Sequence, residues 1–559
     1  MQDFYQQAPT LDNQYLVDPI LRAYLKWKLP KEMLQEIEPE LISLGQRVIT
    51  EILCLGKEAE AQPPRHIPYD PWGRRIDKIE VSAAWKTLDQ IAAEEGLIAI
   101  GYQRRHAAFS RIHQFTKLYL FHPSSAIYTC PLAMTDGAAR AIELYGDDRL
   151  KQGAFQHLTS TDPHLFWTSG QWMTERTGGS DVSGTSTIAK MEGETYSLYG
   201  CKWFTSATTS QMAMTLARIE GDHSGSKGLS LFYLELRDQQ GQLNGIQINR
   251  LKDKLGTKAL PTAELTLSGC KAQLVGGQGD GVKKISSLFN ITRLYNACCA
   301  VGYMRRGLVL AQDYARKRQA FGRLLCEQGL HIETLADLQV EYAAAFHLVF
   351  HAVELLGKEE TGQATKAETA ILRLLTPLAK LYTAKQAIAF ISEVLECFGG
   401  AGYVEDTGLP SLLRDVQVLS IWEGTTNILS LDVLRAIRKE NAAEPFLLDI
   451  KERLALITLE SLNQAKTKAE QALHQLTKYM QSMSQFDEEA QQIAARQFAF
   501  SLTRTYIASL LLEHAAWCHQ QAINPQMLVI AQRWCDKALV TCFQADEIYQ
   551  QASKLLVTN

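Results

Sequence analysis

The last 119 residues contain no glycine, although the whole chain of 559 residues has 36. Prolines in this stretch are limited to Pro445 and Pro525. Because glycine is the usual residue of helix C-caps and tight turns, its absence excludes a region of many short elements. The Gln-, Ala- and Leu-rich sequence keeps an amphipathic spacing, as in 448–480, and so predicts a few long helices.

Several other signals are missing. The eleven cysteines show neither metal-ligand spacing nor a disulfide framework, and the adjacent Cys298 and Cys299 lie in an apolar helical pattern typical of buried thiols, so no metal site is expected. The segment 1–15 lacks the basic region and apolar core of a signal peptide. No uncharged apolar run approaches the roughly 20 residues that span a bilayer. We therefore expect a cytoplasmic protein without a membrane span.

Charge and composition exclude two further classes. Basic residues number 57 against 61 acidic ones, a net charge of −4, which argues against a globally basic nucleic-acid binder. A hydrophobic content of 46% argues against disorder as the dominant state. At roughly 100–200 residues per domain, the length predicts about three to five domains.

The hydrophobic pattern of the sequence changes twice along the chain. Apolar residues at three- and four-residue spacing predict a helix over 81–97, whereas four prolines and a glycine in 61–75 predict a surface connection. Short, partly alternating segments bounded by turn residues predict strands over 194–205, 228–236 and 262–267.

A glycine-rich loop at 276–281 and long helical patterns over 282–440 follow the strand region. The predicted fold is α+β and mostly helical, and the order of elements argues against a doubly wound parallel sheet. The predicted domains are 1–170 (helical), 171–277 (β), 278–440 (helical) and 441–559 (a helical extension).

Two motifs near the β domain could bind a ligand. Thr174–Val182 (TERTGGSDV) has paired glycines that let backbone N–H groups approach an anionic or carbonyl-rich ligand, although an ordinary Gly-Gly turn is the alternative. Lys202–Ser206 (KWFTS) sets a tryptophan beside two hydroxyls, which suits a flat heterocycle with a polar edge. A core tryptophan at a strand end is the alternative for the second motif, and the motif taken by itself favours that alternative.

Two further motifs lie in the helical region. Arg316–Gly322 (RKRQAFG) combines arginine and phenylalanine, which can clamp a phosphate and a ring, or it is a solvated basic helix end. Phe398–Tyr403 (FGGAGY) is followed by Ile421–Asn427 (IWEGTTN), which lies just before a predicted helix over 428–439. The threonine and asparagine side chains of the second segment are either N-caps of this helix or part of an anion site at its N-terminus. In its apolar setting Glu423 has the features of a carboxylate base with a raised pKa.

Together and in this order, the motifs resemble the acyl-CoA dehydrogenase superfamily of flavoproteins over roughly residues 90–440. Segments 68–90 and 250–256 and the long C-terminal extension are similar to the AidB-like branch of that superfamily. The resemblance implies an N-terminal helical domain, a central β-sandwich and a C-terminal helical bundle that enclose FAD, with an extra C-terminal helical domain, in a homotetramer built as a dimer of dimers.

The resemblance also implies roles for individual residues. Arg318 and Phe321 match residues that reach the FAD of a neighbouring subunit, and Ser180 and Arg293 match substrate contacts. The residues implied to bind FAD are Met173, Thr174, Gly179, Ser180, Trp203, Thr205, Ser206, Arg318, Phe321, Gly400, Thr425 and Asn427.

Glu423 matches the catalytic base of the family. Some members instead carry the base immediately before an arginine of the helix that begins near 282, but here Thr292 occupies that position before Arg293. Two residues depart from the common pattern: Glu396 stands where many relatives have glutamine at the FAD, and Asn290 replaces an aspartate common near the CoA moiety.

The activity implied by the resemblance is FAD-dependent α,β-dehydrogenation of an acyl-CoA, with an electron-transfer flavoprotein or similar electron acceptor. The alternative is an AidB-like binding or protective flavoprotein with little turnover, which sequesters acyl-CoA or binds DNA. Residues 441–559 carry 10 basic and 12 acidic residues, a net of −2, which argues against DNA. We expect this extension to pack on the core or on an oligomer partner.

Overall fold

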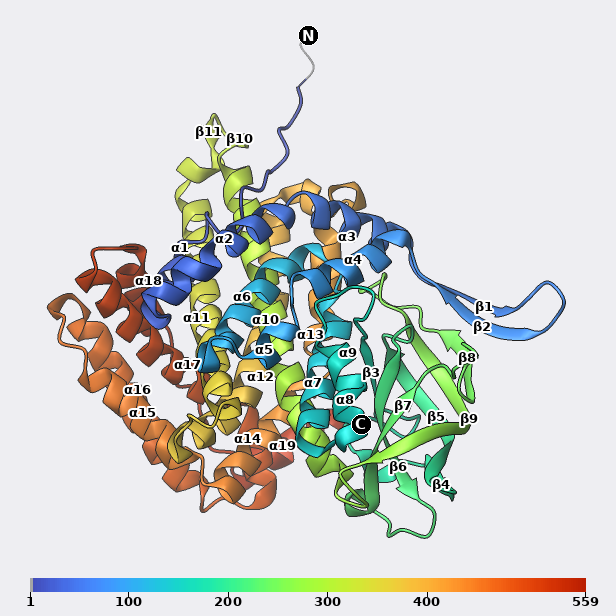
Figure 1. Ribbon diagram of the computed structural model, residues 1–559. Coiled ribbons are helices and arrows are strands. Elements are labelled where there is room, and N and C mark those ends of the chain that lie inside the picture. The colour runs from blue at the N-terminus through green and yellow to red at the C-terminus, as the bar shows by residue number, and fades with distance from the viewer. Residues whose placement is uncertain (1–3, 559) are drawn as a thin grey trace. The chain divides into compact units, whose positions relative to one another are not determined.

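A computed structural model describes residues 4–558 (Figure 1). The chain forms two compact units, each assembled from segments that are distant in sequence. The first unit combines the segments up to Gln46, His106–Phe115 and from Asn296 onward. The second unit combines Arg47–Arg105 with Thr116–Tyr295.

The second unit contains a seven-stranded sheet. Its strands are β3 (Ser169–Trp172), β4 (Ile188–Glu192), β5 (Thr195–Ser206), β6 (Met212–Ile219), β7 (Leu229–Glu235), β8 (Ile246–Leu251) and β9 (Thr262–Val275). They pair in the order β3-β6-β4-β5-β9-β7, with β8 added on β9. Because β6 also pairs with β7, the sheet curls round and closes on itself. Trp172, Leu198, Phe232 and Leu265 lie in one apolar core of this sheet.

The three predicted strands are present as β5, β7 and β9, and β9 extends eight residues beyond the predicted end at 267. The sequence did not reveal the other four strands of this sheet, β3, β4, β6 and β8. In β6 the first six residues are all buried. A strand covered on both faces shows no polar alternation, which is the signal used to recognise strands.

The segment 61–75 is mostly exposed, as a surface connection should be, but the sequence did not reveal that it forms strands. Residues there begin a hairpin of β1 (Arg65–Tyr69) and β2 (Arg75–Glu80), which extends beyond α3 and α4 in Figure 1. Pro68 is tolerated because it is exposed and falls at a register shift in the pairing. The Ile248 carbonyl of β8 accepts from the Arg75 guanidinium at 3.0 Å, so the hairpin is attached to the sheet near its turn.

Helices make up the rest of both units. The remaining helices of the second unit are α3 (Glu51–Ala61), α4 (Ala83–Glu94), α5 (Ala99–Gln103), α7 (Thr129–Tyr145), α8 (Asp148–Gln152) and α9 (Ala154–Leu158). Three helices carry residues of both units: α2 (Lys31–Arg47), α6 (Ser110–Phe121) and α10 (Gly281–Ala315). The helix predicted over 81–97 is confirmed as α4, with Ser82 accepting the N-cap hydrogen bond from Trp85 N–H.

Close packing of α7 on α10 within the second unit requires glycine at position 137. A Cβ there would lie 2.4 Å from Leu288 Cγ. Alanine ordinarily stabilises a helix over glycine, but here overpacking should dominate, and we expect Gly137→Ala to cost about 1–3 kcal/mol. Thermal unfolding measures the loss. Gly184→Ala, whose new Cβ meets only the Thr177 hydroxyl at 4.0 Å, is the control and should be near neutral.

The first unit is a helical bundle with the C-terminal extension. Its helices are α1 (Pro19–Lys28), α11 (Gly329–Glu360), α12 (Lys366–Cys397), α13 (Leu409–Leu419), α14 (Thr426–Glu440), α15 (Ala443–Ala455), α16 (Asn463–Met483), α17 (Glu488–Gln520), α18 (Gln526–Asp536) and α19 (Glu547–Val557). A short hairpin of β10 (Gln319–Ala320) and β11 (Arg323–Leu324) precedes α11. The glycine-free region forms two long helices, α16 and α17, as predicted, and three shorter ones.

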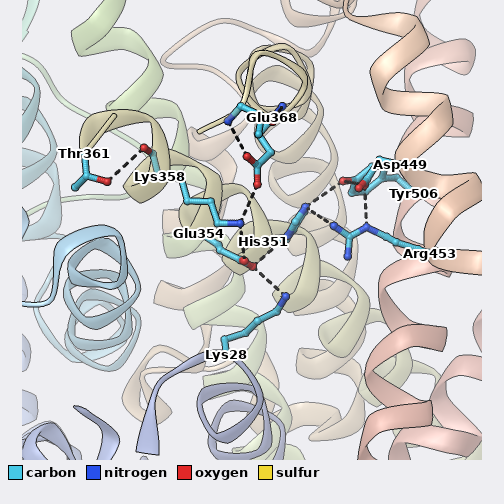
Figure 2. Close-up of polar contacts among 10 residues, drawn as sticks. Lys28, His351, Glu354, Lys358, Thr361, Glu368, Asp449, Arg453 and Tyr506 are labelled. Carbon is cyan, nitrogen blue, oxygen red and sulfur yellow. Dashed lines mark hydrogen bonds and ion pairs between the residues drawn. The ribbon is translucent and has the colours of Figure 1, made fainter. Parts of the chain in front are cut away.

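The extension packs on the bundle, since α17 contacts α11, α12 and α14. Figure 2 shows a polar network across this contact. Arg453 of α15 donates to Asp449 at 2.8 Å and lies 3.3 Å from His351 of α11. His351 is also 3.0 Å from the Tyr506 hydroxyl of α17. Glu354 of α11 pairs with Lys28 of α1 at 3.1 Å, so the network ties the extension to the bundle and to α1.

Two buried histidines lie beside this network. His347 Nδ1 donates to the Ala343 carbonyl at 2.7 Å, and its Nε2 is 2.6 Å from His514 Nδ1 of α17. Trp27 stacks on His514 at 4.8 Å. Burial lowers the pKa of His347 to about 4, and burial with the neighbouring His347 and Lys28 lowers the pKa of His514 too. The folded protein therefore favours both rings in the neutral form.

Acid should weaken the first unit. An unfolded histidine takes up a proton near pH 6.5, but folded His347 does so only near pH 4, so stability falls as pH drops from 6.5 towards 4. The slope should reach about 1.4 kcal/mol per pH unit for this one group. Unfolding midpoints between pH 7.5 and 5 measure it. His347→Gln should flatten the dependence, whereas exposed His474→Gln should leave it unchanged; equal slopes in all three proteins would contradict the assignment.

Among the described residues, one helix, α11, is long and apolar enough to cross a membrane by length and composition. Inside the protein 89% of that stretch is buried, as in the core helix of a bundle. Cys298 and Cys299 are buried, as predicted, and burial raises the pKa of Cys298 well above its usual value.

Candidate functional site

The glycine-rich segment after β3 is a closed loop. The Glu175 carboxylate accepts from the backbone N–H groups of Ser186 and Thr187 at 2.7 and 3.2 Å, and from both of their hydroxyls. These bonds join the two ends of the loop. The backbone N–H of Trp203 in β5 donates to the Thr174 carbonyl at 2.8 Å. The structure thus brings the first two predicted motifs together.

A buried ion pair supports this loop from below. Lys202 is fully buried, and its ammonium lies 2.9 Å from Glu175 and 2.9 Å from the Leu216 carbonyl, to which it donates. Burial alone raises the pKa of Glu175, but Lys202 and the hydroxyls of Ser186 and Thr187 outweigh it and lower that pKa to about 2. Glu175 is therefore a charged structural anchor at neutral pH rather than a proton carrier.

Within the loop, glycine is required at two positions. Gly178 has φ +136°, and a Cβ there would meet no atom within 4 Å. A Cβ at Gly179 would lie 2.5 Å from the Thr174 hydroxyl oxygen. The loop thus keeps backbone N–H groups and the exposed Ser180 open for a ligand, while Met173 beneath it is buried.

The KWFTS segment presents one side of β5. Trp203 is half-buried, with the Lys252 ammonium 3.6 Å from its ring centre. The Ser206 hydroxyl lies 3.1 Å from that of Thr262. Thr205 differs, because its side chain is buried and its hydroxyl donates to the Ala263 carbonyl at 2.8 Å. Of this segment, Trp203 and Ser206 have side chains more available to a ligand than Thr205.

Glu423 lies on a strained turn between α13 and α14. Its φ is +57°, and that of Gly424 is +98°. A left-handed conformation costs a non-glycine residue about 1–2 kcal/mol and persists only where surrounding contacts impose it. The Glu423 side chain is half-buried, beside Trp422. The turn therefore sets the direction of a carboxylate that the sequence predicted to be a base.

The predicted hydroxyls after Glu423 do not serve as helix caps. Thr425 occupies the N-cap position of α14, but its side chain makes no capping hydrogen bond. Thr425 and Asn427 are exposed at this helix N-terminus. Gly400, in a short 3-10 turn after α12, is also exposed, and no atom lies within 4 Å of the Cβ that it lacks. These three positions are open to a ligand.

The RKRQAFG segment follows the end of α10 and contains β10 and the β10–β11 turn. Arg318 lies 3.2 Å from the Gln6 side chain, and Phe321 at the turn is 99% exposed with φ +53°. Phe321 and Glu396 line one groove of about 790 Å³, although they are far apart in sequence. Glu327 and Glu393 make the groove acidic, with Arg323 and His331 also in its lining.

Two residues of α10 were singled out by sequence. Thr292 is buried and its hydroxyl donates to the Phe289 carbonyl at 3.2 Å, so no carboxylate stands at the alternative base position. Arg293 is half-buried on the next residue of the helix.

The residues present suit FAD. A flavin has a flat ring with polar edges, and the second unit offers the Trp203 ring, the Thr174 and Ser206 hydroxyls and the glycine loop. In the first unit, the α14 N-terminus and Gly400 have the open backbone that phosphate groups need.

Four residues that support the predicted site were assigned no role from the sequence: Glu175, Lys202, Asn296 and Lys380. Asn296 accepts from the Trp422 indole N–H, and Lys380 donates to the Gly424 carbonyl. Glu175 and Lys202 lie inside the quoted motifs but were given no role. Two signals identify such buried charges. Lys202 is in phase with inward Leu198 on a strand, and Lys380 is the single charged residue in the apolar run 374–384.

Four family descriptions match the chain in succession. They are the adaptive response protein AidB N-terminal domain (residues 6–162), the acyl-CoA dehydrogenase middle domain (170–270), the acyl-CoA dehydrogenase C-terminal domain (279–438) and the acyl-CoA dehydrogenase 11 C-terminal domain-like family (441–557).

Individual relatives agree with these descriptions. Acyl-CoA dehydrogenase family member 11 of Caenorhabditis elegans is 46% identical over 95% of this chain and 88% of its own length. The crystal structure of C. elegans ACDH-11 in complex with C11-CoA superposes with a TM-score of 0.96 at 44% identity, covering all of this chain and 97% of the other. The putative acyl-CoA dehydrogenase AidB of Escherichia coli K12 is 32% identical over 72% of this chain and 74% of its own.

The chain belongs to the acyl-CoA dehydrogenase family of oxidoreductases, whose cofactor is FAD. Within that family it lies in the AidB-like branch, with the additional C-terminal domain. The predicted fold class, with its helical N-terminal domain, central β-sandwich, helical bundle and extra helical domain, is thereby confirmed.

Proposed function

We propose that this protein is an FAD-dependent dehydrogenase that introduces an α,β double bond into an acyl-CoA thioester, with Glu423 as the base. The observation that carries this proposal is the strained, anchored turn at Glu423. Backbone strain of this kind is retained where surrounding structure imposes it, and it concentrates at functional sites. Thr292 leaves no second carboxylate at the alternative position.

The proposed FAD contacts follow the chemistry of each segment. Thr174, Gly179, Ser180 and Ser206 donate to the flavin edge, beside Trp203, and Met173 lies under the same loop. Thr205 contributes mainly through its backbone, since its hydroxyl bonds to Ala263. For the adenosine and pyrophosphate we assign Gly400, Thr425 and Asn427.

Arg318 and Phe321 are assigned to the FAD of a neighbouring subunit in a homotetramer. The nearly complete exposure of Phe321 supports this role, because an apolar ring on a strained turn gains from being covered by a partner.

In the proposed reaction, Glu423 takes the α-proton as that C–H bond breaks, and its electron pair forms the new double bond. The FAD supplies the hydride acceptor, flavin N5, for the hydrogen that leaves the β-carbon. The Glu423 backbone N–H donates to the thioester carbonyl and stabilises the developing charge. Trp422 restricts water around the carboxylate. Ser180 and Arg293 are assigned to acyl-CoA binding, and an electron-transfer flavoprotein or similar protein is the proposed electron acceptor.

Anaerobic mixing with a panel of saturated acyl-CoAs tests this function. The nematode relative was crystallised with C11-CoA, so the panel should include eleven carbons. We expect the yellow absorbance of oxidised flavin to bleach with at least one chain length. Tight binding without bleaching across the panel would overturn the proposal and establish acyl-CoA sequestration instead.

A further inference from the structure

We propose that Lys380 and Asn296 are positioning residues that hold the turn carrying Glu423 from its two sides. This inference rests on the proposed role of Glu423 as the base. It concerns residues that contact the backbone and the tryptophan next to Glu423.

Lys380 holds the downstream side of the turn. It lies in the middle of α12, is fully buried, and its ammonium donates to the Gly424 carbonyl at 2.6 Å. Its neighbours Leu378, Ala379 and Leu381 are buried apolar residues. Removing a charge from water is costly, so packing alone favours an apolar residue at this position. The charge-assisted hydrogen bond to the Gly424 carbonyl explains why a lysine occupies this position.

Asn296 holds the upstream side. Its side-chain amide donates to the Leu419 carbonyl, the last residue of α13, at 3.0 Å. Its side-chain oxygen accepts from the Trp422 indole N–H. One buried side chain thus links the end of α13 to the residue immediately before Glu423.

Glu423 therefore lies between two fixed points that are only two residues apart, Trp422 and Gly424. Its left-handed φ and that of Gly424 are the torsions that these contacts constrain. The same torsions set the direction of the carboxylate and of the Glu423 N–H. An error of about 1 Å in the placement of a reacting group can cost roughly a hundredfold in rate.

Single-turnover reduction of the FAD-loaded enzyme tests the proposal. Anaerobic stopped-flow mixing with an acyl-CoA that bleaches the wild type gives the limiting rate and, from its concentration dependence, the Kd. We expect Lys380→Met to slow the limiting rate about 100-fold while Kd changes less than about threefold and the FAD content stays the same. Lys380→Arg, which keeps an N–H donor, should recover part of the rate. Exposed Lys366→Met on the same helix is the matched control and should match the wild type.

Asn296→Leu keeps the test decisive if Lys380→Met does not fold. It removes both hydrogen bonds at similar volume and should slow reduction with the same separation of rate from Kd. A wild-type rate in either folded variant overturns the inference and leaves the role of Glu423 intact. Parallel losses of rate, acyl-CoA binding and FAD also overturn it, because they indicate a merely structural role. A wild type that no acyl-CoA bleaches overturns the proposed function and this inference together.

Discussion

Glu423→Gln is expected to slow flavin reduction by acyl-CoA about 10³- to 10⁴-fold. The amide has nearly the same shape as the carboxylate and can occupy the same turn, but it cannot accept the α-proton. General base catalysis typically contributes about 10²- to 10⁴-fold, and the upper part of that range is expected because position 292 offers no substitute carboxylate. Anaerobic stopped-flow absorbance measures the rate, and the FAD content of the purified variant should equal that of the wild type.

The matched control is Glu405→Gln, an exposed glutamate between α12 and α13 whose carboxylate pairs with Arg414. It should reduce flavin at the wild-type rate. A Glu423→Gln enzyme that retained full activity would remove Glu423 from the reaction and leave the strained turn without a catalytic explanation.

Lys202→Met should strongly destabilise the second unit. It leaves the Glu175 carboxylate buried without its cation, and breaking a buried pair in this way typically costs about 3–5 kcal/mol. For a unit of this size that corresponds to a fall of roughly 10 °C in the unfolding midpoint. The flavin loop should loosen at the same time, since the carboxylate joins its two ends, and FAD affinity should fall.

Lys190→Met is the comparison for this variant. Lys190 pairs with Glu220 at 3.0 Å in the same unit, but both side chains are about half exposed or more, so the loss should stay below about 1 kcal/mol. Similar midpoints for Lys202→Met and Lys190→Met would show that the buried pair adds nothing beyond a surface contact. Fluorescence titration with FAD separates the effect on the loop from the effect on stability.

Helices and strands could be predicted from the sequence where their local residue pattern agreed with their burial in the fold. Helix α4 combines an apolar face with a Ser82 N-cap, and β5, β7 and β9 are bounded by turn residues. By contrast, β6 is buried on both faces, so its sequence does not alternate between apolar and polar residues. The β1–β2 hairpin contains Pro68 at an exposed register shift, and a proline by itself argues against a strand. The domain boundaries at 171, 278 and 441 stay predictions.

The residues of the site were foreseeable as motifs but not as a supported geometry. Glu423 was conspicuous as a carboxylate in an apolar setting, and Trp203 as an aromatic residue beside hydroxyls. The left-handed backbone of Glu423 could not be foreseen. Its φ depends on Lys380, 43 residues earlier in the chain, and on the contact of the Trp422 indole with Asn296. Contacts between distant helices leave no periodic trace in sequence. The cofactor and substrate roles of the individual residues remain predictions for the experiments above.

The late position of α17 has a consequence for synthesis. Helix α11 ends at Glu360 and α17, which packs on it, ends at Gln520, so 160 residues are translated between the two. At about 5–20 residues per second, a ribosome needs roughly 10–30 seconds to make them. During that interval α11, a segment with the composition of a membrane span, lacks the part of its cover that α17 provides. We therefore expect chaperones that shield apolar nascent segments to bind this chain until α17 has emerged.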